Sequence, residues 1–212
     1  MDDIFPEDSY KDAYIRDARF FESAYIENLG GGSFKLHPLP LEAQVAPLSG
    51  MLSDDYNYDG NTDILIVGNY YSTTISDGRY DASIGLLLTG NGKGEFSPVP
   101  GRESGFYADG DAKAMAELVM KDGSSLILVA RNSDSLKVIK TIPRSKQTIR
   151  LKRDDVSAEL IYNSGEKEYR EFFYASGYLS QSSRVCKVPE SVVSVWISNY
   201  KGEKREIPLV NK

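Results

Sequence analysis

The sequence predicts an all-β protein, and three observations lead to that prediction. Aromatic residues, which favour half-buried strands, are numerous, with 14 Tyr and 8 Phe among 212 residues. Apolar and charged residues alternate in many short segments, whereas helical periodicity is poor and is best over residues 8–20. Glycine-rich stretches separate these segments, as expected of the turns in β-hairpins.

The first two thirds of the chain contain an internal repeat. A glycine-rich stretch at residues 28–40 resembles residues 90–100, and the matching Phe34 and Phe96 lie 62 residues apart. The apolar runs that end at Val67 and Val129 show the same separation. Two landmarks with one offset indicate two copies of a structural unit. Four strands are expected in each copy: at 24–28, from 34, at 50–54 and at 64–67, then at 84–89, from 96, at 113–120 and at 126–129.

The pattern of the strands divides the chain into two domains. The run at residues 64–67 is continuously apolar, which suits a strand buried on both faces, as in the inner layers of a β-propeller. From Pro143 onward, alternating segments form two expected hairpins, 158–162 with 168–174 and 192–197 with 204–209. We therefore expect a partial β-propeller of two blades with an N-terminal extension at residues 1–142, and a small β-sandwich or β-roll at residues 143–212.

Charge and composition exclude several classes of function. Residues 1–142 carry 12 Lys and Arg against 22 Asp and Glu, whereas the remainder carries 13 against 9. The acidic part disfavours nucleic acid and suits cations. No run of 18 apolar residues exists, so we expect no membrane insertion, and this chain shows no signal peptide. With one cysteine, Cys186, and one histidine, His37, the chain can form neither an internal disulfide nor a His/Cys zinc site.

The strongest motif is a loop of oxygen-bearing side chains at residues 55–63. Asp55, Asn57, Asp59 and Asp63 occupy positions 1, 3, 5 and 9 of this loop, with glycine at position 6. A hard divalent cation needs six or more oxygens at about 2.3–2.6 Å, and alternate residues of a tight loop can surround one centre. The backbone carbonyl of Asn61 would add another ligand. The alternative is a solvated turn rich in Asp and Asn.

This loop differs from an EF-hand. An EF-hand requires a glutamate at position 12 and flanking helices, but position 12 is Ile66, within an expected strand. The matching part of the second copy, near residues 117–123, lacks the pattern, so one Ca²⁺ site is predicted. The loop and the apolar run after it resemble FG-GAP or VCBS-type propeller repeats. That resemblance implies calcium in the loop between two strands and an extracytoplasmic location, as on integrin ectodomains and bacterial surface proteins.

The C-terminal part is similar to the ASPIC/UnbV domain that often follows such repeats. The string Ser-Gly-Tyr-Leu-Ser-Gln-Ser at residues 176–182, the segment 192–196 and the turn at Gly202 carry this similarity. Neither family implies an established catalytic activity. The leading hypothesis is therefore a non-catalytic, calcium-binding, extracytoplasmic binding or scaffold module for a protein or glycan partner. The alternatives are a carbohydrate-active enzyme or carbohydrate-binding accessory module, and a nucleic-acid-binding protein, which would need a basic patch.

Two blades do not close a ring, because propellers have about 4–8. We therefore expect either a piece of a longer repeat protein or open strand edges that something covers. The N-terminal segment, the C-terminal domain or a second copy of the chain could provide that cover, and self-association through an open edge follows from the last case. The polar segment at residues 72–82, which contains the Asp77-Gly78 turn signal, is expected to be an exposed loop suited to partner binding.

Overall fold

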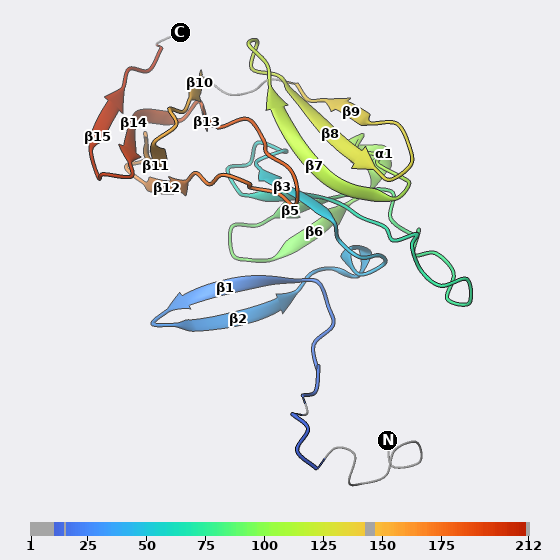
Figure 1. Cartoon of the computed structure of the whole chain (residues 1–212). Helices are drawn as coiled ribbons and strands as arrows, with labels where there is room; N and C mark the ends of the chain where they lie inside the picture. Colours follow the sequence, from blue (N-terminus) through green and yellow to red (C-terminus); the bar gives the residue numbers. More distant parts are fainter. Residues whose placement is uncertain (1–10, 15, 143–146, 211–212) are drawn as a thin grey trace.

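The computed structural model describes residues 11–14, 16–142 and 147–210, and antiparallel strands dominate it (Figure 1). In the first 142 residues the strands are β1 (Ala24–Gly30), β2 (Ser33–Pro38), β3 (Gly50–Asp54), β4 (Asp63–Val67), β5 (Leu86–Gly90), β6 (Phe96–Val99), β7 (Ala112–Val119), β8 (Ser125–Arg131) and β9 (Lys137–Lys140). After them come β10 (Gln147–Arg150), β11 (Asp155–Tyr162), β12 (Lys167–Glu171), β13 (Val185–Val188), β14 (Val192–Asn199) and β15 (Lys204–Ile207).

Helix is limited to two short turns in the described residues, η2 (Leu41–Ala43) and α1 (Gly101–Ser104). The weak helical pattern over residues 8–20 produces no helix at residues 11–14 and 16–20. None of the described helices is long and apolar enough to cross a membrane. The prediction of an all-β fold is therefore confirmed.

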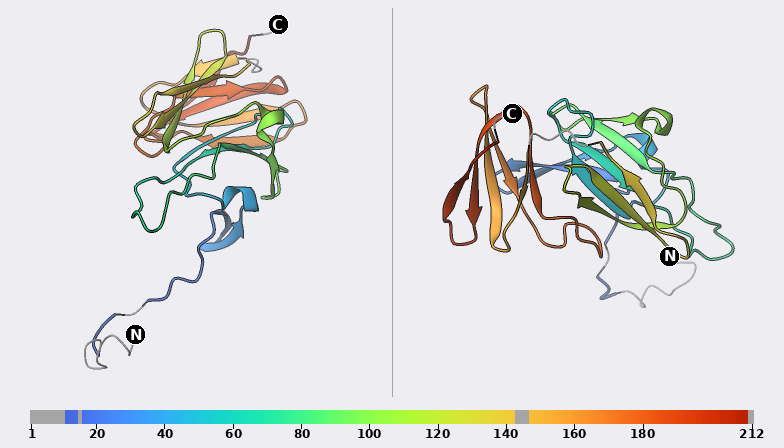
Figure 2. Two further views of the ribbon diagram at one scale, coloured as in Figure 1. Left: turned by 90° about the vertical axis from the view of Figure 1, so that its right-hand side faces the viewer. Right: turned by 90° about the horizontal axis from the view of Figure 1, so that it is seen from above.

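Three antiparallel sheets are stacked in chain order in the first 142 residues (Figures 1 and 2). The hairpin β1–β2 lies against the sheet β3-β4-β5-β6, which lies against the sheet β7-β8-β9. One apolar core fills each of the two gaps. The core beside the hairpin contains Leu39, Ala43, Ile64, Ile66 and Leu88. The core between the two larger sheets contains Leu65, Val67, Leu87, Phe106, Ala108, Ala112, Met115, Ile127 and Val129.

Strand β4 is buried on both faces, as its continuous apolar sequence predicts. Ile64 and Ile66 point into the core beside the hairpin, and Leu65 and Val67 point into the other core. The division follows from the strand geometry, because successive side chains point to opposite faces. No described sheet closes on itself, and the sheets of this part form an open stack.

The strand spacing has the offset found in the sequence, but the side-chain orientations do not repeat. The strand starts separated by 62 residues are Ala24 and Leu86, Gly50 and Ala112, and Asp63 and Ser125. Val67 and Val129, however, lie in the same core between two sheets. If the two copies were stacked in the same orientation, Val67 and Val129 would point in the same direction and so into different cores. Strand β7 also has a register shift between Ala112 and Ala114, so structural equivalence of the two copies stays a prediction.

The C-terminal part consists of two sheets packed face to face. The order of the larger sheet is β12-β11-β14-β15, and the smaller sheet pairs β10 with β13. Both predicted hairpins are present, as β11 with β12 and β14 with β15. The core between the sheets contains Ile149, Ala158, Leu160, Cys186, Val188, Val192, Val195 and Ile197. The domain boundary predicted at Pro143 lies outside the described residues.

A C-terminal segment covers the free edge of β7. The amide of Ser183 donates to the carbonyl of Glu117 at 2.7 Å, and Oγ of Ser182 accepts from the amide of Glu117 at 3.0 Å. Oγ of Ser180 donates to the carbonyl of Met115 at 3.1 Å. These bonds satisfy backbone groups that an edge strand would otherwise offer to another chain. The covering residues belong to the string at residues 176–182 and to Ser183 beside it.

Candidate calcium loop

The predicted metal loop connects β3 to β4, and Asp63 is the first residue of β4. Two residues of the loop have positive φ angles, Tyr58 at 68° and Gly60 at 89°. Glycine adopts this backbone region without the penalty that a Cβ brings, so Gly60 fits the reversal of the chain. The resulting loop is tight, and its residues Asn57, Tyr58, Asp59 and Gly60 are exposed to solvent.

Asp55 organises the first part of the loop. Its Oδ1 accepts hydrogen bonds from the amides of Tyr58 at 2.6 Å and Asp59 at 3.2 Å, and its Oδ2 accepts from the amide of Gly60 at 2.9 Å. One carboxylate thus fixes three consecutive amides around it. The turn is therefore set by the side chain of its first residue, in the manner of an Asx-turn.

Asn57, Asp59 and Asn61 form a second set of contacts at the exposed tip. Nδ2 of Asn57 donates to Oδ2 of Asp59 at 2.9 Å, and the amide of Asp59 donates to Oδ1 of Asn57 at 2.9 Å. The amide of Asn61 donates to Oδ1 of Asp59 at 2.7 Å. The side chains of positions 3 and 5 are thus in contact at one end of the loop.

Asp63 lies beneath the loop rather than at its surface. Its side chain is fully buried, and its Oδ2 accepts from the amides of Tyr56 at 2.9 Å and Asn57 at 3.1 Å. Its Oδ1 accepts from the amide of Gly90, at the end of β5, at 3.0 Å. The sequence predicts Asp63 as the residue that closes a metal site, but it does not predict this anchoring role.

The charges of the loop act on one another. Burial is the largest cause of the raised pKa of Asp55, the amides of Gly60 and Tyr58 oppose it, and the charges of Asp59 and Asp63 add to the rise. The pKa of Asp59 is lowered, chiefly by the hydrogen bond from the amide of Asn61 and then by the side chain of Asn57. A bound divalent cation would relieve the repulsion at Asp55, because it stabilises the ionised form.

The donor set fits a hard cation in its chemistry, since every predicted ligand atom is an oxygen. Each carboxylate oxygen that accepts one hydrogen bond retains a second lone pair. Within residues 11–14, 16–142 and 147–210, however, no three or more His, Cys, Asp or Glu side chains converge as a ready metal centre. The five predicted residues share one loop, but the carboxylates of Asp55, Asp59 and Asp63 accept hydrogen bonds from backbone amides.

A cluster that sequence reasoning did not find lies next to the loop. Nζ of Lys187, on β13, contacts the carboxylate of Asp54 and lies 2.6 Å from Oε1 of Glu117. Burial alone would lower the pKa of Lys187, but the charges of Asp54 and Glu117 outweigh it and raise the pKa. The three residues come from different sheets and are far apart in the chain. No local pattern could therefore have predicted the cluster.

Three other residues or segments singled out in the sequence have clear positions. Nε2 of His37, on β2, lies 2.9 Å from Oε2 of Glu27 on β1. Cys186, on β13, is buried, and burial raises the pKa of its thiol to about 11. Residues 77–79, in the loop between β4 and β5, are exposed as predicted, and this loop projects from the stacked sheets in Figure 1.

Comparison with known proteins does not assign the chain to a family. No protein-family model matches the sequence, and no curated protein matches it. The function therefore rests on the chemistry and geometry of the residues described above.

Proposed function

We propose that this chain is a calcium-stabilised, non-catalytic binding or scaffold module that works outside the cytoplasm. The observation that carries the proposal is the loop at residues 55–63, where three carboxylates and two amide side chains lie within nine consecutive residues. Burial, and to a smaller extent the charges of Asp59 and Asp63, raise the pKa of Asp55, and a bound cation would favour its ionised form. A bound divalent cation would therefore stabilise this loop, because it would offset the repulsion between the carboxylates.

The proposed ligands come from the outer part of the loop and from the buried Asp63. Asp55, Asn57 and Asp59 would supply side-chain oxygens from the loop, and Asn61 its carbonyl. Asp63 would close the site from beneath, while its bonds to backbone amides hold the loop on β4. Calcium accepts irregular sets of 6–8 oxygens, whereas magnesium demands a near-ideal octahedron. The mixed set of carboxylate, amide and carbonyl oxygens in this loop therefore suits calcium better than magnesium.

The scaffold in this proposal is a partial β-propeller followed by a small β domain. Support comes from the stacked antiparallel sheets, from the burial of β4 on both faces and from the resemblance of the loop to FG-GAP or VCBS-type repeats. The extracytoplasmic location rests on that resemblance. It also agrees with calcium affinities of about 10⁻⁴–10⁻³ M in extracellular modules, since such sites fill only where calcium is abundant.

The test is thermal unfolding of the chelated protein alone, with millimolar calcium, and with millimolar magnesium. Calcium should stabilise the fold by about 2.7 kcal/mol at a concentration 100 times the dissociation constant. Asp59→Ala should abolish this gain, whereas Asp77→Ala, which removes an exposed carboxylate from another loop, should retain it. Equal melting temperatures in all three solutions, for protein shown to be free of metal at the start, would reject the proposal.

A further inference from the structure

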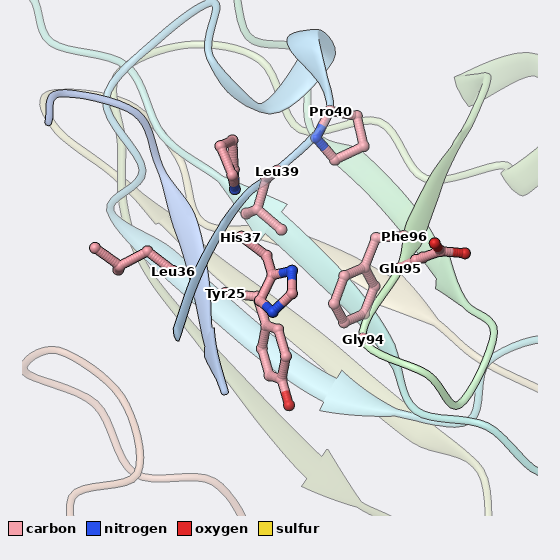
Figure 3. Close-up of a pocket in the computed structure, with 9 residues that line it drawn as sticks. Tyr25, Leu36, His37, Leu39, Pro40, Gly94, Glu95 and Phe96 are labelled. Atoms are coloured by element: carbon pink, nitrogen blue, oxygen red, sulfur yellow. The ribbon is translucent and has the colours of Figure 1, made fainter. Parts of the chain in front are cut away.

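A pocket of about 310 Å³ lies between the hairpin β1–β2 and the strands β5–β6 (Figure 3). Tyr25 and His37 line it from the hairpin, Phe96 lines it from β6, and Glu95 lines it from the turn before β6. Leu39 forms part of its wall and is almost fully buried. The volume is at the lower end of the range for small-molecule sites, which is about 300–1,000 Å³.

Aromatic rings from both elements form the apolar side of this pocket. The ring centroids of Tyr25 and Phe96 are 5.8 Å apart at an interplanar angle of 68°, and those of Tyr25 and His37 are 5.9 Å apart at 37°. Edge-to-face and tilted pairs of this kind fix ring orientation. The rings therefore offer a pre-formed surface rather than one that a ligand must order.

Polar groups border the same pocket, and in Figure 3 the carboxylate of Glu95 points away from Tyr25 and His37. Glu27 holds the ring of His37 through the 2.9 Å contact between Oε2 and Nε2, and Nδ2 of Asn91 donates to Oε2 of Glu95 at 2.6 Å. The hydroxyl of Tyr25 points away from the ring cluster in Figure 3.

We propose that this pocket binds a neutral saccharide. Aromatic rings match the C–H face of a sugar ring, while the imidazole and the Tyr25 hydroxyl can exchange hydrogen bonds with its hydroxyl groups. Anionic ligands are disfavoured, because Glu27 and Glu95 carry negative charge beside the rings. A small organic cation fits less well, because Glu27 already faces the imidazole of His37 and the hairpin places Lys35 opposite Glu27.

The pocket is connected to the proposed calcium loop through the turn at residues 91–95. A Cβ added to Gly92 would lie 2.4 Å from Oδ1 of Asn61, and one added to Gly94 would lie 3.0 Å from Cε1 of Tyr25. The turn thus touches the loop on one side and the pocket on the other. Calcium should therefore tighten saccharide binding by holding this turn in place, an effect that rests on the proposed function, whereas the pocket itself does not.

The experiment uses His37, the only histidine of the chain, as an NMR reporter. The calcium-loaded full chain is titrated with methyl glucoside, methyl galactoside, N-acetylglucosamine, maltose and cellobiose, up to tens of millimolar. At least one of them should shift the His37 ring signals in a saturable way. The indole signal of Trp196, which lies on β14 of the C-terminal part, should not follow. If none of the five sugars shifts the His37 signals in a saturable way, the proposal is overturned.

Matched variants locate the contact. Tyr25→Ala should weaken binding by about tenfold or more, which corresponds to roughly 1.4 kcal/mol. Tyr25→Phe, which keeps the ring and guards against a folding defect, should weaken it less. Phe34→Ala is the control, because Phe34 lies on the opposite face of the same hairpin and is 64% exposed. Equal losses in Tyr25→Ala and Phe34→Ala would overturn the assignment.

Two further arms separate the remaining outcomes. Tetramethylammonium should leave the His37 signals unchanged. If this cation shifts them in a saturable way and none of the sugars does, the ligand is an organic cation and the saccharide proposal is overturned. Chelation of calcium should weaken sugar binding in the wild type. Sugar binding that is unaffected by the chelator would refute the coupling between calcium and the pocket but not the saccharide site itself. Calcium binding to Asp59→Ala, which should be lost, tests the proposed function separately.

Discussion

The amide of Gly90 donates a hydrogen bond to Oδ1 of Asp63 at 3.0 Å, and this bond joins the loop at residues 55–63 to the end of β5. The other oxygen of Asp63 accepts two amides of the loop itself. One buried carboxylate thus holds a loop, the start of β4 and the turn after β5 together. A buried charge is costly unless hydrogen bonds compensate it, and three amides do so here.

The first prediction concerns Asp63 without metal. Asp63→Ala should destabilise the chelated protein by at least about 3 kcal/mol, because three amide donors lose their acceptor and each buried unpaired group costs about 1–3 kcal/mol. Urea unfolding measures the change. Asp59→Ala is the control, since Asp59 is exposed and should change the chelated protein little. Equal urea midpoints for the two variants would contradict the anchoring role.

The second prediction concerns the pH dependence of calcium binding. Calcium competes with protons for Asp55, whose pKa in the metal-free loop lies above its ordinary value of 3.8, chiefly because of burial. As the pH falls, the affinity should therefore begin to drop at a higher pH than an ordinary aspartate would give. Calorimetric titration with calcium over a descending pH series measures this. An affinity that stays constant until the pH reaches the ordinary range of aspartate would refute it.

The third prediction concerns the contact between the two parts of the chain. In a double-mutant cycle, Glu117→Gln and Lys187→Met should show a coupling free energy of about 1–3 kcal/mol in urea unfolding, because their side chains are only 15% and 23% exposed. The exposed pair of Lys167 and Glu159 is the matched control and should show a much smaller coupling. Similar coupling in both cycles would show that the cluster does not join the two parts.

The fourth prediction concerns acid stability. Burial alone would raise the pKa of Asp155, but the bidentate bond from Arg205 and the amide of Lys152 outweigh it and hold the pKa below 3.8. The folded protein therefore binds this proton less tightly than the unfolded chain. The resulting stability is complete above the unfolded pKa of about 3.9 and is lost as the pH falls through the folded pKa.

Urea unfolding at descending pH tests this fourth prediction. Asp155→Asn should lose about 1–3 kcal/mol at neutral pH and show a flatter loss of stability in acid. The neighbouring Asp154→Asn should keep the wild-type profile. Parallel profiles for wild type and Asp155→Asn would mean that this carboxylate does not contribute to the acid transition.

The sequence by itself determined the strands, because their pattern is local. The apolar run at residues 64–67 predicted a strand buried on both faces, and β4 is that strand. Glycine-rich turns and alternating segments placed both C-terminal hairpins, since a tight turn leaves neighbouring strands little choice of partner. The loop at residues 55–63 was recognisable for the same reason, as all five predicted ligands lie within nine residues.

Only the tertiary structure decided how these local pieces meet. It turned Asp63 inward to bind Gly90, and it brought Lys187 to Asp54 and Glu117 from a different sheet. It also placed Tyr25 beside Phe96, which creates the pocket. These contacts join residues that lie dozens of positions apart, and they depend on how whole sheets stack. Sheet stacking is set by the combined burial of many apolar side chains, and a local pattern of residues does not encode it.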